Sequence, residues 1–298
     1  EIPSETILRE TRTMACFAPS GRRYAFPLEG VSVGRRAFDK ALAFRAEGAG
    51  AELRYPAGVV GVRDGEVRLA SGERIEAKVV VGADGPLSVV ARSSGFSVPR
   101  EMYRMITGTS TGAFPPEVDL YFGSLAPGGY AWMIPKAEEA NVGLGVSQLP
   151  PHETLGRLLD RFLERVGIPR ATDRTQWWVP IGPPPRSAVA GRCLMAGDAA
   201  NLVMATNGGG IPTAMISGRD AGGVAAAHVR DGTPLREYDR LWKEHLYGPL
   251  ARGYRIKRFG DRVAGSDRLL SLGMRYIGAS GLDEMMRLRW PSLIGGFP

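Results

Sequence analysis

Cysteine and histidine are scarce in this sequence, which limits the chemistry that it can carry. The 298 residues include 2 cysteines, Cys16 and Cys193, and 3 histidines, and none has the short spacing of a zinc or iron–sulfur ligand set. We therefore expect no metal site and no disulfide framework, and we place the chain in a reducing, cytoplasmic setting. Both cysteines are interpreted as small buried residues.

Long apolar runs are also missing. No stretch approaches the ~20 residues that cross a membrane, and we expect no signal peptide. Charge is plentiful, with 38 Lys and Arg against 31 Asp and Glu, a net charge of +7. A basic balance permits contact with nucleic acid, an anionic membrane or a phosphorylated ligand. One basic cluster stands out, and it fits either a solvated helix face or contact with anionic headgroups: Arg252, Arg255, Lys257, Arg258 and Arg262.

Hydrophobic periodicity predicts a mixed order of strands and helices. In the first hundred residues we expect a strand within 5–19, a helix from 35 that ends near Gly48, a hairpin turning at Asp64-Gly65 with a second turn at Ser71-Gly72, and a buried strand at 79–81. Antiparallel strands within 105–148, an amphipathic helix at 152–167 and a strand from Thr175 follow. The last part has a buried strand at 191–196, a helix at 211–230 and helices after Pro234. This order indicates a discontinuous α/β domain that a sheet domain interrupts.

The segment that begins at Gly197 combines features that a hydrophobic core does not need. An apolar strand delivers Asp198 at its carboxyl end, where ligands bind in open α/β sheets. Hydroxyl or amide donors, such as those of a sugar or ribityl chain, are natural partners for this carboxylate. Glycines 208–210 then remove three β-carbons, and Ile211 and Pro212 start a helix whose free amides carry about half a positive charge. Tight helix packing alone would explain the glycines, but not the aspartate before them, so a ligand site is favoured.

Five segments of the chain follow one another in a recognisable order. They are GVSVGRRAFDKAL (30–42), VVVGADGPLSVVAR (79–92), PGGYAWMIPK (127–136), ANVGLGV (140–146) and GDAANLVMATNGGGIPTAMISGRDA (197–221). Together they resemble the flavoprotein hydroxylase superfamily and, more closely, its geranylgeranyl reductase family.

The resemblance implies a set of contacts with FAD and with an isoprenoid substrate. Asp198 would hold the ribityl chain, the amides of 208–211 would face the pyrimidine edge of the flavin, and Asp84 with Gly85 would lie near the pyrophosphate and ribose. The implied cofactor-binding residues are Arg35, Asp84, Gly85, Gly197, Asp198, Gly208, Gly209, Gly210 and Ile211, and the implied substrate-binding residues are Tyr130, Trp132 and Pro135.

The same resemblance implies a reductase that saturates C=C bonds of geranylgeranyl or related isoprenoid lipids, with electrons from NAD(P)H or ferredoxin. The partner would be an isoprenoid lipid or prenyl diphosphate, reached by a cytoplasmic protein at the membrane periphery, with no nucleic acid. No catalytic residue stands out, and Tyr130 is a weak candidate for proton donor. An apolar tunnel or a sheet core would both explain the aromatic residues Tyr121, Phe122, Tyr130, Trp132, Trp177 and Trp178.

Departures from the family pattern keep other interpretations open. Asn201 replaces a usual Gly, Met204-Ala205 replaces Asn-Pro, and no G-x-G-x-x-G fingerprint follows a strand. We therefore expect that the chain lacks roughly the first fifty residues of the fold, including a cysteine-bearing segment near the flavin. The alternatives are an aromatic hydroxylase, a flavoprotein–quinone oxidoreductase, and an isoprenoid-binding relative that has lost FAD.

The predicted fold class is α/β, or α+β overall. It has a discontinuous, Rossmann-like FAD-binding domain, an inserted antiparallel β-sheet substrate domain and a helical C-terminus. The predicted ranges are 28–100 and 188–232 for the two FAD-binding parts, 101–187 with 1–27 for the substrate domain, and 233–298 for the helical region.

Overall fold

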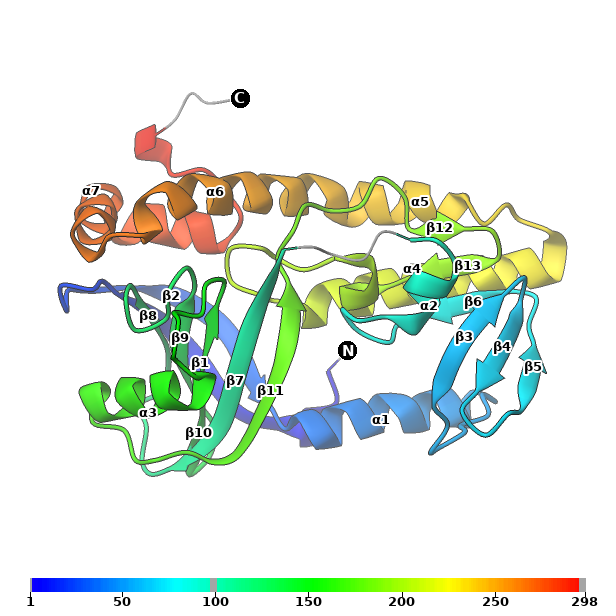
Figure 1. The fold of residues 1–298 in the computed structure, drawn as a ribbon, viewed down its shortest axis with the longest axis horizontal. Coiled ribbons are helices and arrows are strands. Elements are labelled where there is room, and N and C mark those ends of the chain that lie inside the picture. The colour runs from blue at the N-terminus through cyan, green and yellow to red at the C-terminus, as the bar shows by residue number, and fades with distance from the viewer. Residues whose placement is uncertain (1, 97–100, 295–298) are drawn as a thin grey trace.

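A seven-stranded sheet is the largest element of the computed structural model, which describes residues 2–96 and 101–294 (Figure 1). In sheet order its strands are β11 (Thr172–Pro180), β7 (Met102–Thr111), β10 (Glu139–Val146), β9 (Tyr130–Pro135), β8 (Glu117–Phe122), β1 (Ile7–Phe17) and β2 (Arg23–Val33). Neighbouring strands pair antiparallel, except that β1 and β8 run parallel. The sheet thus joins the start of the chain to strands that follow residue 101.

One face of this sheet is covered by the amphipathic helix α3 (Leu155–Val166). Leu159 and Phe162 of the helix and Leu144 of β10 are fully buried there. The Thr154 hydroxyl accepts a hydrogen bond from the Arg157 N–H in the first turn, and Gly167 ends the helix with a φ of 70°. These caps and the apolar stripe confirm the helix predicted at 152–167.

The opposite face packs against α7 (Asp267–Met286). Met274, Ile277 and Leu282 of that helix lie in one core with Tyr130 and Trp132 of β9. We call this group the sheet–α7 core. The loop that precedes helix α4 (Ile211–Asp231) reaches this core, because Val203 belongs to the same cluster.

The other half of the molecule holds two small sheets and the helices packed around them. One sheet has the order β12 (Val189–Ala190), β13 (Cys193–Met195) and β6 (Val80–Gly82), with β13 and β6 parallel, and the other is the meander β3 (Val59–Arg63), β4 (Glu66–Leu69) and β5 (Arg74–Glu76). The helices are α1 (Arg35–Gly48), α2 (Val89–Ser93) and α4 (Ile211–Asp231). Leu194 of β13 and Ala221 of α4 are fully buried between these elements.

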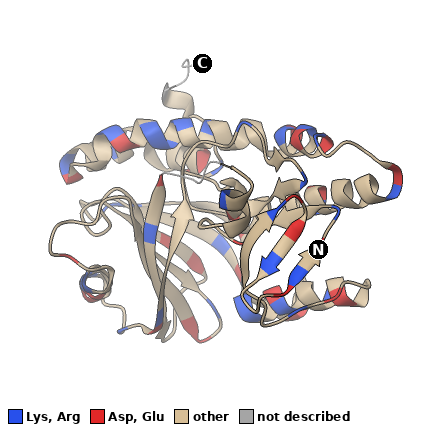
Figure 2. Cartoon of the chain, turned by 45° about the vertical axis from the view of Figure 1, so that its right-hand side comes forward, with Lys and Arg blue, Asp and Glu red and all other residues tan. Residues whose placement is uncertain are grey.

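A long helical rod runs above both halves (Figure 1). It consists of α5 (Glu237–Trp242), a π-helical turn at Lys243–Tyr247 and α6 (Gly248–Ala264). Lys and Arg recur along the helices above the large sheet (Figure 2). Within 2–96 and 101–294, no helix is long and apolar enough to cross a bilayer.

The structure confirms most predicted elements and corrects one. The strand at 79–81 is not buried as predicted, because β6 is an edge strand of its sheet in the described structure and Val81 keeps 39% of its surface exposed. By contrast, β13 is buried along its length, and Cys16 and Cys193 are buried as interpreted. The expected boundary at residue 100 and the last four residues of the helical region fall on 97–100 and 295–298, outside the described residues.

Candidate cofactor and substrate site

The turn after β13 is held against helix α4 by its first residue. Gly197 has a φ of 57°, and its N–H donates to the Ser217 hydroxyl of α4 at 3.0 Å. A β-carbon on Gly197 would lie 3.1 Å from that of Ala214. A side chain here would therefore push the turn away from α4, and with it the neighbouring Asp198.

Asp198 is partly buried in the turn Gly197–Ala200 that follows β13. Burial raises the pKa of its carboxyl group, and the Arg35 guanidinium of α1 partly opposes that rise. Arg35 itself is paired with Asp39 at 3.0 Å. No side-chain hydrogen bond to Asp198 occurs within the described part of the chain, so its carboxyl oxygens are available to a ligand. Arg35 thus acts on the charge of Asp198, and both residues are among those implied by the resemblance.

The glycine loop before α4 uses some of its own amides. The Gly208 N–H donates to the Met204 carbonyl at 2.8 Å, and the Gly209 N–H donates to Asn207 Oδ1 at 3.0 Å. The Met204 N–H in turn donates to the Gly209 carbonyl at 3.0 Å. The amides of Gly208 and Gly209 are therefore engaged within the loop, and contact between the amides of 208–211 and a ligand stays a prediction.

The remaining amides of this loop are those of Gly210 and Ile211. Helix α4 has 21 residues, and no side chain caps its N-terminus. Uncapped N–H groups at a helix start carry partial positive charge, which favours an electron-rich edge of a ligand. A β-carbon on Gly210 would lie 3.0 Å from Asp198 Oδ1. The Asp198 carboxylate and the start of α4 thus form one cradle that is open because residue 210 is glycine.

The departures from the family pattern in the connecting loop are accommodated. Asn201 adopts a φ of 58°, a left-handed conformation that Asn tolerates better than most residues with a β-carbon. Its side-chain amide donates to the Pro183 carbonyl. Met204 is the residue that bonds to both Gly208 and Gly209. Asn in place of Gly, and Met in place of Asn, therefore still allow a closed loop.

Asp84 has a local role that its motif does not reveal. Both of its carboxyl oxygens accept hydrogen bonds from the start of α2, namely from the Ser88 hydroxyl and from the N–H groups of Val89 at 2.7 Å and Val90 at 3.2 Å. Gly85 follows with a φ of 80°. Ser88 also caps α2 by accepting the Ala91 N–H at 2.8 Å. Asp84 therefore shapes the loop between β6 and α2. Ser88, which sequence reasoning did not select, is the residue that indicates a helix start here.

The sheet reaches the glycine loop through Tyr130. Its buried hydroxyl donates to the Asn207 carbonyl. A β-carbon on Gly208 would lie 3.2 Å from the Tyr130 hydroxyl oxygen. Burial raises the pKa of Tyr130 well above its usual range. Asn207, which sequence reasoning did not select, thus links the sheet–α7 core to the loop through its backbone carbonyl and to Gly209 through its side chain.

Trp132 lies in the same core and is fixed by a polar network. Its indole N–H donates to Asn141 Oδ1 at 2.8 Å, and the Asn141 amide donates to Thr107 Oγ1 at 2.7 Å. The ring lies over Gly143, where a β-carbon would overlap it. Pro135, the third predicted substrate residue, is buried at the far end of β9, away from the glycine loop.

A single tunnel lined by all six expected aromatic residues is wrong, because successive residues of a strand face opposite sides of a sheet. Tyr121 faces α3 and stacks on Phe17 with ring centres 4.5 Å apart, whereas Phe122 joins the sheet–α7 core. On the edge strand β11, Trp177 and Trp178 are 49% and 37% exposed. Of the six, Phe122, Tyr130 and Trp132 share the sheet–α7 core.

Sequence comparison identifies related proteins. The geranylgeranyl reductase catalytic domain matches residues 102–176. A digeranylgeranylglycerophospholipid reductase of Methanothrix thermoacetophila is 33% identical over 291 residues, which cover 88% of this chain and 74% of that protein. Its counterpart in Methanocaldococcus jannaschii is 31% identical over 275 residues, 83% and 70% of the two chains. Against reductase 1 of Methanothermobacter thermautotrophicus the identity is 33% over 254 residues, and this chain spans only 64% of that protein's length.

Solved structures show the same fold. A geranylgeranyl bacteriochlorophyll reductase-like protein of Thermoplasma acidophilum superposes with a TM-score of 0.80 at 24% identity, covering 99% of this chain and 83% of that one. Klebsiella pneumoniae HpxO, complexed with FAD and uric acid, gives a TM-score of 0.63 at 18% identity, covering 97% and 79%. The chain therefore shares its overall fold with these two proteins.

Proposed function

Because this chain belongs to the geranylgeranyl reductase family, we propose that it saturates carbon–carbon double bonds of geranylgeranyl lipid chains with FAD as its cofactor. The observation that carries this proposal is the cradle of Asp198 and the uncapped start of α4, next to a loop that Tyr130 ties to the sheet–α7 core. One side of the loop offers groups for a cofactor and the other offers an apolar, aromatic core.

The residues present fit a flavin. Asp198 has carboxyl oxygens free to accept hydroxyl groups, and Gly210 leaves room where a β-carbon would crowd that carboxylate. The N–H groups of Gly210 and Ile211 suit the edge of the flavin ring that gains negative charge on reduction. When bound, FAD supplies the hydride equivalent that alkene reduction requires. Arg35 is proposed as a further cofactor contact, and Asp84 with Gly85 shape the loop after β6.

The protein's own residues would position the lipid chain and exclude water. Tyr130 and Trp132 belong to the apolar core next to the glycine loop, so we assign them to the wall that the isoprenoid meets. Tyr130 is a poor proton donor, since its hydroxyl is already donated to the Asn207 carbonyl and burial raises its pKa. We give it a positioning role instead. Pro135 is kept as a substrate-side residue of β9.

The proposed organisation has two cofactor-binding parts around a substrate sheet, with a helical region at 233–298. Because β2 extends the sheet to Val33, the predicted boundary between 27 and 28 is moved, and the cofactor-binding parts are 34–100 and 188–232 while the substrate sheet is made by 101–187 with 1–33. The substrate is proposed to be an isoprenoid lipid or prenyl diphosphate, met at a membrane surface by a cytoplasmic protein. NAD(P)H or ferredoxin would supply the electrons.

The test is flavin binding followed by alkene reduction. The full chain is titrated with FAD and the visible spectrum is recorded for the wild type, for Asp198→Ala and for Asp64→Asn, whose carboxylate is exposed on a turn. Loss of two or more hydrogen bonds to a charged acceptor should weaken FAD binding at least about tenfold in Asp198→Ala, and the control should match the wild type. Dithionite-reduced protein should then lower the number of double bonds in a geranylgeranyl lipid, which mass spectrometry detects as a gain of two hydrogens for each bond reduced.

The result also separates the alternatives. Hydroxylation of an aromatic acid, or electron transfer to a quinone without loss of a lipid double bond, would replace the reductase proposal. A wild-type chain that binds geranylgeranyl lipid but takes up no FAD would contradict it and would leave an isoprenoid-binding protein.

A further inference from the structure

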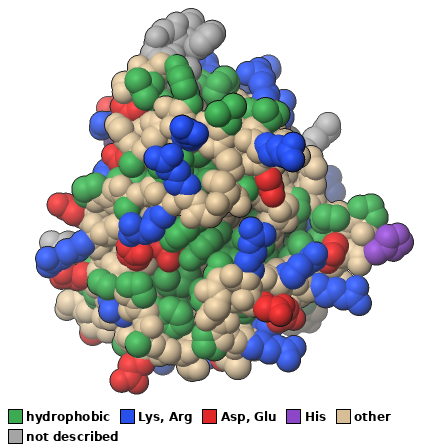
Figure 3. Space-filling view, turned by 90° about the vertical axis from the view of Figure 1, so that its left-hand side faces the viewer, with side chains coloured by type: hydrophobic (Ala, Val, Ile, Leu, Met, Phe, Trp, Pro, Cys, Tyr) green, Lys and Arg blue, Asp and Glu red, His purple; other side chains and the backbone are tan. Residues whose placement is uncertain are grey.

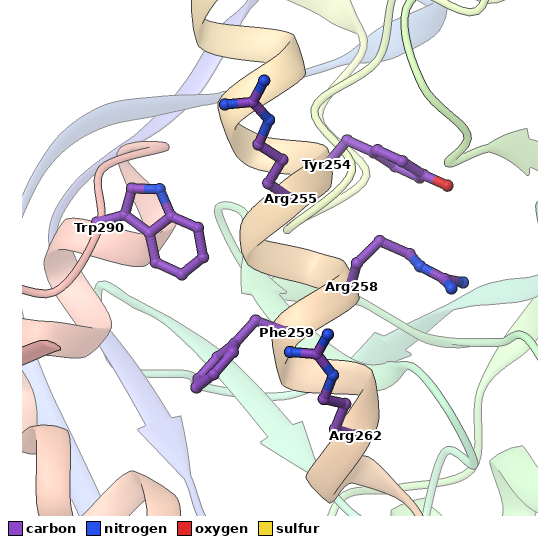
Figure 4. Close-up of a pocket in the computed structure, with 6 residues that line it drawn as sticks. All are labelled: Tyr254, Arg255, Arg258, Phe259, Arg262 and Trp290. Atoms are coloured by element: carbon purple, nitrogen blue, oxygen red, sulfur yellow. The ribbon is translucent and has the colours of Figure 1, made fainter. Parts of the chain in front are cut away.

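A cavity of about 330 Å³ lies along α6, outside the site described above. It is lined by Tyr254, Arg255, Arg258, Phe259, Arg262 and Trp290. Figure 4 shows Phe259 and Trp290 on one side of α6, with Tyr254 and Arg258 on the other. Because 254, 258 and 262 are four positions apart and 255 and 259 are four positions apart, the five residues of α6 share one broad face of the helix. The cavity thus has three guanidinium groups and aromatic walls, but no carboxylate in its lining.

The charge of this pocket is not balanced by neighbouring acids. Asp261 is paired with Lys257 at 2.8 Å, and Glu101 accepts the Tyr254 hydroxyl at 2.7 Å. Within 2–96 and 101–294, neither Arg255 nor Arg258 has an ion-pair partner, and both are exposed. Like charges three or four positions apart on a helix repel one another, so an anion in the pocket would relieve that repulsion.

The basic cluster noticed in the sequence divides into two groups with different roles. Arg252 donates to the Leu288 carbonyl at 2.7 Å, and the Lys257 side chain is only 8% exposed, with its ammonium 5.9 Å from the Tyr103 ring centre. These two residues hold α6 to its surroundings. The guanidinium groups of the pocket face outward instead, and that of Arg262 lies 5.9 Å from the Phe259 ring centre.

We propose that this pocket binds the phosphate group of a lipid, and in particular the phosphorylated head of the lipid that the enzyme reduces. Guanidinium groups match phosphate oxygens by geometry and charge. The aromatic walls suit the apolar atoms next to that phosphate, since Trp at such a position has an apolar body and a polar N–H. The proposal rests on the proposed function only in taking the reduced lipid as the ligand.

The surroundings of the pocket favour an amphiphile over a free nucleotide or a free phosphate. Exposed apolar side chains follow one stripe of α7, where Leu269, Leu272 and Tyr276 are 53%, 62% and 68% exposed, and Leu293 after Trp290 is 63% exposed. Figure 3 shows hydrophobic side chains interspersed with Lys and Arg on the side of the molecule that carries α7. Apolar surface mixed with cations in this way is typical of contact with anionic lipid.

The pocket is also close to the core that we assign to the substrate. Lys257 extends from α6 over Tyr103, and Tyr103 belongs to the sheet–α7 core together with Tyr130 and Trp132. Helix α6 is therefore the element that carries the phosphate pocket on one broad face and touches the substrate core with another residue. A lipid head held at α6 would keep the isoprenoid chains of the same molecule near that core.

Binding of lipid and non-lipid probes to the FAD-treated full chain tests the proposal. Isothermal titration compares geranylgeranyl diphosphate, geranylgeraniol, inorganic pyrophosphate, ADP and vesicles of phosphatidylglycerol with phosphatidylcholine. The variants are Arg255→Gln, Arg258→Gln and their combination, and the control is Arg268→Gln, an exposed arginine of α7 outside the pocket. Because the substituted side chains are exposed, circular dichroism should show unchanged folding.

The expected pattern is selective. Each lost guanidinium should weaken geranylgeranyl diphosphate binding about tenfold, and added salt should weaken it further, while geranylgeraniol binding and the flavin spectrum stay unchanged. Arg268→Gln should behave as the wild type. Equal losses for the diphosphate and the alcohol, or no loss for either, would overturn the proposal.

Other outcomes would also count against it. ADP or pyrophosphate bound as tightly as the lipid diphosphate, and lost in the same variants, would mean a nucleotide or free-phosphate site. Weaker binding to vesicles alone would mean that the pocket contacts lipids of the bilayer, and it would contradict the proposal that the pocket binds the substrate. If the diphosphate pattern holds while no FAD binds, the pocket stands and the reductase proposal fails. If FAD binds while the arginine substitutions leave diphosphate binding unchanged, the reductase proposal stands and the pocket proposal fails.

Discussion

Asp119 is a carboxyl group inside the large sheet with no ion-pair partner in the described structure. It lies on β8 with 5% of its surface exposed, and the Tyr121 hydroxyl donates to its Oδ2 at 3.3 Å. Its Oδ1 has no hydrogen-bond partner among the described residues. Burial raises the pKa of Asp119 from 3.8 to about 7, and the nearby charge of Glu117 adds to the rise, whereas Tyr121 and Arg23 oppose it.

This shift makes the stability of the fold depend on pH. The folded state keeps the Asp119 proton up to about pH 7, whereas the unfolded chain releases it above 3.8. The group's contribution is therefore complete below the unfolded pKa and is lost as pH rises through the folded pKa. One pKa unit corresponds to about 1.36 kcal/mol, so the loss is at most about 4 kcal/mol. Asp119→Asn mimics the protonated side chain and should remove this loss.

Urea unfolding followed by tryptophan fluorescence measures the effect. Between about pH 5 and about pH 8 the wild type should lose up to about 3 kcal/mol of unfolding free energy through this group, and Asp119→Asn should lose that much less. The matched control is Asp64→Asn, which removes a carboxyl group whose side chain is 93% exposed and should retain the wild-type slope. An Asp119→Asn variant with the wild-type pH slope would refute the reasoning.

Three further substitutions test other contacts. Gly143→Ala places a methyl group within the Trp132 ring and should cost about 1–3 kcal/mol or more, seen as a lower thermal midpoint; an unchanged midpoint would mean that the ring moves freely. Tyr130→Phe leaves the Asn207 carbonyl without the Tyr130 hydroxyl and should lower the free energy of unfolding by about 1–3 kcal/mol while weakening FAD binding. An unchanged FAD affinity would contradict a role of this hydrogen bond in shaping the glycine loop for the cofactor. Ser88→Ala removes the cap of α2 and should cost about 1 kcal/mol in urea unfolding, and no change would show that Asp84 caps the helix alone.

Elements with local signals could be predicted from the sequence. Helix α3 has a Thr cap, a Gly stop and an apolar stripe, all of which act within a few residues. The turn of β3 and β4 at Asp64-Gly65 and the start of α4 at Ile211 are likewise set by neighbouring residues. The joint position of Arg35 and Asp198 was implied by resemblance, because nothing local relates two residues so far apart.

Features that depend on distant partners could not be predicted. The Gly208 and Gly209 amides are used by Met204 and Asn207, and the loop conformation that brings these groups together is not visible in the spacing of three glycines. The burial of Val81 depends on which strand lies beside β6, and the separate role of Lys257 depends on Tyr103 beneath it. Each of these is decided by packing between segments rather than by the segment itself.

The parallel pairing of β1 with β8 has a consequence for synthesis of the chain. The hairpin β1–β2 is complete at Val33, but its partner β8 is made only between Glu117 and Phe122. At about 5–20 residues per second a ribosome needs roughly 5–20 s to cover that interval. Throughout that time the backbone of β1 that will pair with β8 has no sheet partner, so the nascent hairpin is open to chaperones and to other nascent strands. A ribosome that stalls before β8 emerges would hold a chain with this edge exposed, while one that passes it can close the sheet.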